Sequence, residues 1–260
     1  MKTVTSKDGT LIAYDQSGSG FPLILVDGAL CSRAFGPMPE LAQHLAANFM
    51  VINYDRRGRN ESGDTKPYTI GREIEDIEAL INEVGGSALV FGISSGAALA
   101  LAAAASGLNI PKLAVYEPPF MVDEKYQPPA DSLDRLKIMI DEDRRGDAVK
   151  FFMKDMVGVP AIAVFIMKLM PIFKKLKAVA HTLPYDVTIL GDFSLPENMA
   201  ASVKIPTLIS GGDKSQVELQ QAVKKLSEVM PDSKLQILKG QTHNVSAKVI
   251  APILTEFFKG

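Results

Sequence analysis

Short apolar runs alternate with stretches of helical spacing over most of the chain. The runs at 22–26, 50–54, 88–93 and 112–116 are almost continuously apolar, which is typical of strands buried on both faces of a parallel sheet. Between the second and third runs, apolar residues recur at helical spacing over 70–84. This alternation predicts an α/β fold with a doubly wound, mostly parallel central sheet.

The two ends of the chain complete this pattern. Near the start, two strand-like runs flank Asp8-Gly9, a dipeptide typical of a hairpin turn. After Pro206 the alternation returns in two strands and two helices, at 207–210, 217–230, 234–238 and 245–258. We therefore expect residues 1–119 and 196–260 to form one core.

The alternation stops between residues 120 and 195, where the sequence is rich in methionine and aliphatic residues. Prolines divide this stretch, and Lys168 interrupts its longest apolar run, which is shorter than the roughly 20 residues that a membrane span needs. We predict an inserted helical cap over 120–195 and no stable membrane insertion. Because the stretch is also basic, reversible attachment to a membrane surface is the alternative.

Charge and cysteine content narrow the classes of partner and cofactor. The formal net charge of −2 over 260 residues argues against nucleic acid or an anionic membrane as a partner. The single cysteine, Cys31, excludes an internal disulfide and a cysteine-based metal cluster. Neither a dinucleotide fingerprint nor metal-ligand spacing occurs, so we expect no cofactor and no metal. Because no apolar signal segment opens the sequence, we expect a cytoplasmic protein.

The pentapeptide Gly92-Ile93-Ser94-Ser95-Gly96 joins one of the apolar runs to an alanine- and leucine-rich helical stretch. In such a strand–turn–helix the serine lies at the apex of a sharp turn, where its hydroxyl is accessible. The two glycines fit because strand and helix backbones approach too closely there for side chains. We predict Ser94 as a nucleophile; an ordinary tight turn is the simpler alternative.

A serine nucleophile needs a base within hydrogen-bond reach. The chain contains three histidines, His44, His181 and His243. His44 is expected within a helix and His181 within the cap, whereas His243 follows the last predicted strand. Since the carboxyl ends of parallel strands share one edge of the sheet, we predict His243 as the general base facing Ser94.

These motifs together resemble the α/β-hydrolase fold with a helical cap, over nearly the full length of the chain. The resemblance rests on the serine pentapeptide, on the segments 54–59 and 240–243, and on the order serine, acid, histidine. It implies an oxyanion hole formed by the backbone N–H groups of Ala29 and Ser95. Such donors stabilise the negative charge that develops on the substrate.

The acid departs from the usual pattern of this family. It ordinarily lies a few residues after the strand at 207–210, but Ser215 stands at that place and Asp213 is two residues early. A variant of the fold takes its acid from the end of the strand that follows the nucleophile's helix, where Glu117 stands. We favour Glu117 and keep Asp213 as the alternative; the third outcome is that no acid is present.

Two neighbours of the predicted site also depart from the family. Many relatives carry His-Gly where this chain has Asp27-Gly28, and Ile93 replaces the polar residue that often precedes the serine. A carboxylate beside an oxyanion is unfavourable unless it points away or is paired. We expect the backbone donors to be retained, with altered local hydrogen bonding around them.

The segment Arg56-Arg57-Gly58-Arg59 is the most basic loop of the predicted core. No glycine-rich phosphate loop accompanies it. We therefore expect structural ion pairs rather than phosphate binding, with Asp55, Glu61 or Asp64 as partners.

The combined expectation is a cofactor-independent serine hydrolase that acts on a small or medium apolar ester through an acyl-enzyme. The methionine-rich cap suggests the apolar acyl group. The alternatives are a lyase or perhydrolase on the same fold, or a slow-turnover ligand-binding sensor. A small molecule is the expected partner, and the sequence leaves the oligomeric state open.

Overall fold

An eight-stranded sheet forms the centre of the computed structural model, which describes residues 1–260. The strand order is β1-β2-β4-β3-β5-β6-β7-β8. Strand β2 pairs antiparallel with β1 and β4, and all other pairs are parallel. The bounds are β1 Lys2–Thr5, β2 Leu11–Ser17, β3 Pro22–Val26, β4 Met50–Tyr54, β5 Leu89–Ile93, β6 Leu113–Tyr116, β7 Thr207–Gly212 and β8 Ser233–Leu238. The predicted doubly wound, mostly parallel sheet is confirmed.

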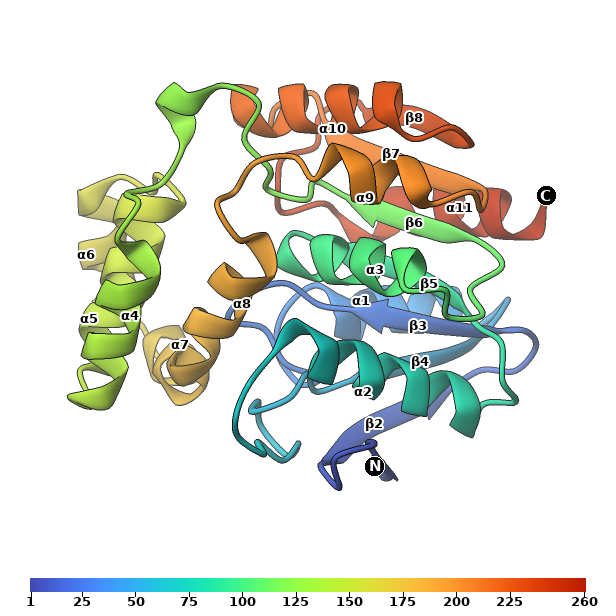
Figure 1. Ribbon diagram of the computed structural model, residues 1–260, viewed down its shortest axis with the longest axis horizontal. Coiled ribbons are helices and arrows are strands. Elements are labelled where there is room, and N and C mark those ends of the chain that lie inside the picture. The colour runs from blue at the N-terminus through green and yellow to red at the C-terminus, as the bar shows by residue number, and fades with distance from the viewer.

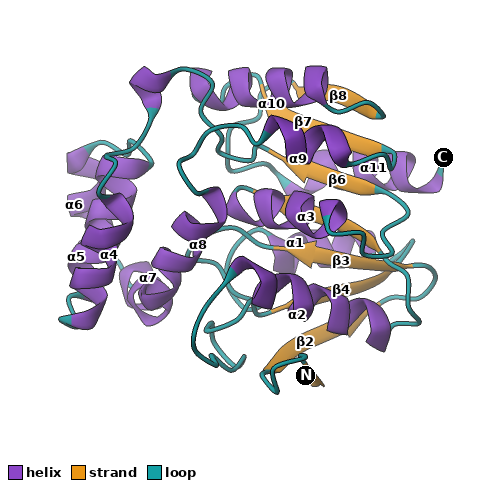
Figure 2. Ribbon diagram, viewed as in Figure 1, coloured by secondary structure: helices purple, strands orange, loops and turns teal.

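Helices cover both faces of the sheet (Figure 1; Figure 2). One face carries α1 and α11, and the other carries α2, α3, α9 and α10. Every residue of β3, β5 and β6 is buried, which is why these strands read as continuous apolar runs. The bounds are α1 Met38–Leu45, α2 Ile70–Glu83, α3 Ser95–Ala105, α9 Glu197–Ser202, α10 Val217–Val229 and α11 Ala247–Lys259.

The residues between Phe120 and Leu195, called the inserted segment below, form helices, turns and loops, and apart from an isolated bridge between Met121 and Ser194 they contain no strand. Most of this segment lies beside the sheet, at the left of Figure 1, whereas its last helix approaches α3. Pro160 and Pro171 stand directly before α6 and α7. The bounds are α4 Ser132–Asp141, α5 Arg145–Phe151, α6 Ala161–Leu169, α7 Ile172–Val179 and α8 Leu183–Leu190. Two short 3₁₀ helices, η1 Glu124–Tyr126 and η3 Ala180–Thr182, and a π-helical segment, η2 Phe152–Met156, complete the segment.

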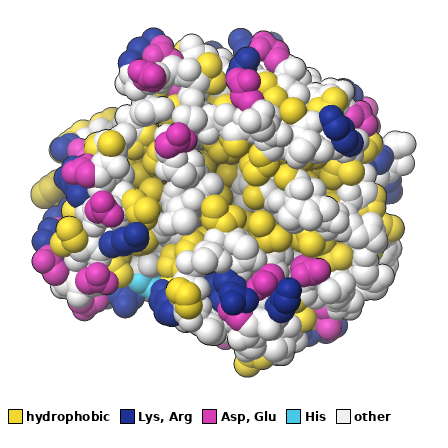
Figure 3. Space-filling model, in the orientation of Figure 1, with side chains coloured by type: hydrophobic (Ala, Val, Ile, Leu, Met, Phe, Trp, Pro, Cys, Tyr) yellow, Lys and Arg dark blue, Asp and Glu magenta, His cyan; other side chains and the backbone are white.

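Acidic and basic side chains are interspersed on the face of the molecule shown in Figure 3. Such mixing accords with a net charge of −2 from 28 basic and 30 acidic residues. None of the helices combines the length and the apolarity required to cross a bilayer.

Candidate active site

Ser94 lies at the apex of the turn between β5 and α3, with φ 57° and ψ −130°. Its backbone N–H donates to the carbonyl of Tyr116 over 2.9 Å, which ties the turn to β6. A Cβ on Gly92 would lie 2.4 Å from the carbonyl oxygen of Gly96, and one on Gly96 would lie 2.3 Å from that of Val26. Only glycine fits at either place, so the spacing of the pentapeptide follows directly from this turn.

His243 pairs with Glu117 at the end of β6. The His243 Nδ1 lies 2.8 Å from Glu117 Oε2, and the N–H of Gly212 donates to Glu117 Oε1 over 2.7 Å. The Glu117 side chain is completely buried, whereas that of His243 is 34% exposed. An Nδ1–H that donates to the carboxylate leaves Nε2 of the ring as an acceptor.

Asp213 takes no part in this pair. Its Oδ1 accepts the N–H of Gly240 over 2.6 Å, and so it joins the ends of β7 and β8. The structure therefore brings Glu117, and not Asp213, to the imidazole of His243.

Ser94 and His243 line one cavity of about 560 Å³. No hydrogen bond joins the two side chains; contacts of this kind commonly tighten when substrate binds. No three His, Cys, Asp or Glu side chains lie close enough together to hold a metal ion. Much of the cavity wall is apolar and comes from the inserted segment, including Phe152, Met153, Met167 and Leu176.

The β3 loop (residues 27–31) lies against the serine turn. A Cβ on Gly28 would approach the Cβ of Ser94 to 3.0 Å. Ala29 lines the cavity, and its N–H has no acceptor within the protein. Ser95 begins α3, where helix amides have no acceptor in the preceding turn. The amides of Ala29 and Ser95 therefore both lack an acceptor within the protein.

Asp27 points towards its own loop. Its Oδ1 accepts the N–H of Gly28 over 2.9 Å, while Oδ2 is buried without a hydrogen bond. Burial raises the pKa of Asp27 to about 7, although Arg59 and Arg56 lie near enough to oppose the shift. Burial thus favours the neutral carboxyl, which lessens the negative charge expected to disfavour an oxyanion.

The arginine loop (residues 56–59) makes buried ion pairs, but with carboxylates other than those expected from the sequence. Asp55 and Glu61 pair with Arg33, and Asp64 pairs with Lys66. The guanidinium groups instead turn inwards to partners from other parts of the chain, namely Arg56 to Glu73 and Asp186, Arg57 to Asp8 and Asp76, and Arg59 to Asp186. The prediction of partners close in the sequence was wrong. These arginines are buried, so they pair with the carboxylates that the fold brings to them and not with their neighbours along the chain.

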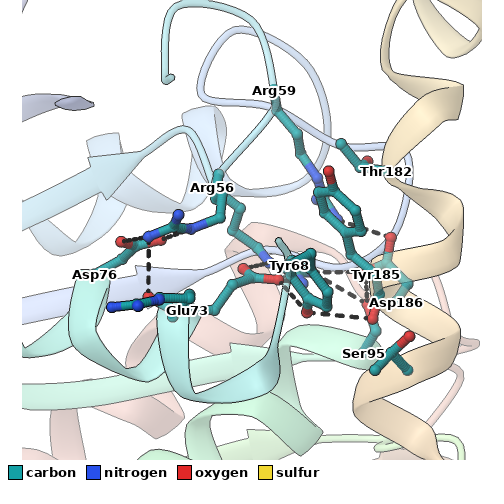
Figure 4. A network of polar contacts seen from close by, with 12 residues as sticks. Arg56, Arg59, Tyr68, Glu73, Asp76, Ser95, Thr182, Tyr185 and Asp186 are labelled. Atoms are coloured by element: carbon teal, nitrogen blue, oxygen red, sulfur yellow. Dashed lines mark hydrogen bonds and ion pairs between the residues drawn. The ribbon is translucent and has the colours of Figure 1, made fainter. Parts of the chain in front are cut away.

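Asp186 on α8 is the residue of this region that the sequence reasoning missed. Figure 4 shows Arg56 and Arg59 extending towards it from the arginine loop. Burial alone would raise the pKa of Asp186, but Arg59 and Arg56 outweigh this effect and lower it. The available signal was a lone acid in the otherwise uncharged helix Leu183–Leu190, because buried acids are rare unless paired.

Comparison with known proteins agrees with this geometry. A model of the alpha/beta hydrolase family matches residues 17–248, and the chain belongs to that family. An alpha/beta hydrolase from Sphaerobacter thermophilus is 49% identical, covers 99% of this chain and 100% of its own, and superposes with a TM-score of 0.93.

More distant structures share the fold. An esterase from Exiguobacterium antarcticum is 20% identical over 100% of this chain and 99% of its own, with a TM-score of 0.75. The enol-lactonase from Burkholderia xenovorans is 17% identical over 100% of both chains, with a TM-score of 0.73. A search of curated proteins found no match. The family supports a hydrolase as the general class, and these two distant neighbours show the shared fold.

Proposed function

We propose that the protein is a cofactor-independent serine hydrolase that cleaves carboxylic esters through an acyl-enzyme. The observation that carries this proposal is the pair His243–Glu117, 2.8 Å apart, on the same cavity as a serine with φ 57°. A serine hydroxyl needs a base to remove its proton. The buried carboxylate holds the imidazole in the tautomer that can act as this base, and it stabilises the imidazolium that forms when the proton is taken.

In the proposed reaction, Ser94 Oγ attacks the ester carbonyl while Nε2 of His243 takes the hydroxyl proton. The amides of Ala29 and Ser95 stabilise the tetrahedral oxyanion. Collapse of this intermediate breaks the bond to the alcohol, which leaves with the proton from His243. Water then gives a proton to Nε2 of His243 and attacks the acyl carbon. When this second tetrahedral intermediate collapses, the bond to Ser94 Oγ breaks, His243 returns the proton to Oγ, and the carboxylic acid is released.

The size and the lining of the cavity support the proposal that the substrate is small or medium in size and has an apolar acyl group. Its volume of about 560 Å³ lies within the usual range for small ligands. Methionine side chains adapt to varied apolar shapes, and Met153 and Met167 both line it. The neighbours described as an esterase and an enol-lactonase act on the same class of bond.

A fluorophosphonate probe tests the nucleophile without knowledge of the natural substrate. We expect one covalent adduct, placed on Ser94 by peptide mass spectrometry, and hydrolysis of p-nitrophenyl butyrate that Ser94→Ala abolishes. A serine at the other end of the same helix offers a matched control, because Ser106 caps the C-terminus of α3 and does not line the cavity, so Ser106→Ala should still be labelled at position 94. Hydrolysis that survives Ser94→Ala, or no adduct on folded wild-type protein, would overturn the proposal.

A further inference from the structure

The guanidinium of Arg59 lies between α8 and the β3 loop. Its Nη2 donates to both carboxylate oxygens of Asp186, at 2.9 Å each. Its Nη1 donates to the carbonyl oxygen of Gly28 over 2.5 Å and to that of Cys31 over 3.2 Å. Arg59 and Asp186 are each only 1% exposed, so water does not compete for these contacts.

The carbonyl of Gly28 and the N–H of Ala29 belong to the same peptide group. Because this group is planar and trans, its C=O and N–H point in opposite directions. A donor fixed on the Gly28 oxygen therefore fixes the direction of the Ala29 N–H. A charged donor also polarises the peptide, which strengthens hydrogen bonds from its N–H.

The same carboxylate also binds the side chain of Ser95, whose backbone N–H is the second proposed oxyanion donor. Asp186 Oδ1 accepts from Ser95 Oγ over 2.7 Å and from Arg56 Nη1 over 2.7 Å. Arg56 Nη1 also lies 3.2 Å from the carbonyl oxygen of Asp27, and Glu73 binds the other side of its guanidinium. Asp186 thus lies near Arg56, Arg59 and Ser95 (Figure 4). Through these residues, one side chain of the inserted segment is connected to both segments that carry the donors.

We propose that Asp186 and Arg59 are positioning residues of the oxyanion hole: Arg59 orients the Gly28–Ala29 peptide, and Asp186 fixes Arg59 and Ser95. This assignment rests on the proposed function. Neither residue lines the cavity, so the expected loss falls on the step that forms the oxyanion and not on substrate binding.

The arginine loop contains its own matched control. Arg57 is as buried as Arg59, and it donates to Asp76 over 2.7 Å and to Asp8 over 2.6 Å. None of its hydrogen bonds reaches the β3 loop or the serine turn. Substitutions of Arg57 and Asp76 therefore disturb a buried ion pair of the same kind without touching the proposed donors.

The experiment compares Arg59→Lys and Asp186→Asn with Arg57→Lys and Asp76→Asn. We expect the first pair to lower kcat for p-nitrophenyl butyrate by about 10- to 100-fold, less than the complete loss of a donor, with KM nearly unchanged. The rate of phosphonylation of Ser94 should fall in parallel, because the phosphoryl oxygen occupies the same hole. Both control variants should retain kcat near the wild-type value.

Circular dichroism and thermal unfolding identify any variant that fails to fold. If Asp186→Asn is such a variant, Arg59→Lys decides alone, since it keeps the positive charge opposite Asp186 but loses the two-nitrogen fork. Equal effects in the two pairs, or a rise in KM alone, would overturn the assignment. Absence of an adduct on Ser94 in the wild type is a separate result, which would instead overturn the proposed function.

Discussion

Two buried carboxyl groups, Glu117 after β6 and Asp27 after β3, stand at the same edge of the sheet with different partners. Glu117 accepts a backbone N–H on one oxygen and meets the ring of His243 with the other. Asp27 accepts the N–H of the next residue on one oxygen, and its carboxyl lies beside the thiol of Cys31 and not beside a base. Burial therefore does not define the role of either carboxyl; the group that each one faces does.

The substitution Glu117→Gln is expected to have the largest effect on activity. Glutamine retains the size of the side chain but cannot stabilise an imidazolium, so the acylation rate should fall by about 10³- to 10⁴-fold. Stopped-flow release of p-nitrophenol measures this rate directly. A loss of less than about tenfold would show that His243 acts without this carboxylate.

The substitution Asp27→Asn is expected to change how stability depends on pH, whereas the substitution at Glu117 is expected to change activity. The folded pKa of about 7 exceeds the ordinary value of 3.8, so the folded state binds the extra proton between these values. Wild-type stability should consequently fall as pH rises through this window, by up to about 1.4 kcal/mol per unit from this group alone. The asparagine side chain cannot titrate, and the variant should lack this contribution.

Urea unfolding at pH 5 and pH 8 tests this expectation. Any constant cost of the amide cancels when the change between the two pH values is compared, rather than the stabilities themselves. Identical changes in wild type and variant would mean that Asp27 ionises as readily in the folded as in the unfolded chain.

Asp213→Asn should have the smallest effect. The amide oxygen of the introduced asparagine can still accept the N–H of Gly240, and Asp213 itself makes no hydrogen bond to His243. We expect kcat/KM for p-nitrophenyl butyrate to remain close to that of the wild type. A loss comparable to that of Glu117→Gln would show that Asp213, in the loop after β7, acts as the acid.

The parts of the molecule that local sequence determines were predicted well. Buried parallel strands need apolar residues on both faces, so β3, β5 and β6 were found almost to the residue. The sharp turn at Ser94 was visible because two glycines are required by backbone contacts within a short segment. The choice between Glu117 and Asp213 remained open, because it depends on the relative positions of two strand ends.

Long-range pairing explains what was missed. Arg59 and Asp186 lie 127 positions apart in the chain. The sequence around either residue does not identify the other as its partner. A buried arginine predicts that a carboxylate must exist somewhere, but only the folded chain shows which one. The same reason caused the incorrect assignment of Asp55, Glu61 and Asp64 as partners of the arginine loop.

The attachment of α8 to the arginine loop has a consequence for exchanging helical insertions between relatives. A graft of the whole range 120–195 would replace Asp186 and leave the charge of Arg59 buried without its carboxylate, which is strongly destabilising. A graft that ends before Leu183 would keep α8 with the recipient. In this hydrolase the segment that can be transplanted is therefore shorter than the segment that interrupts the sheet.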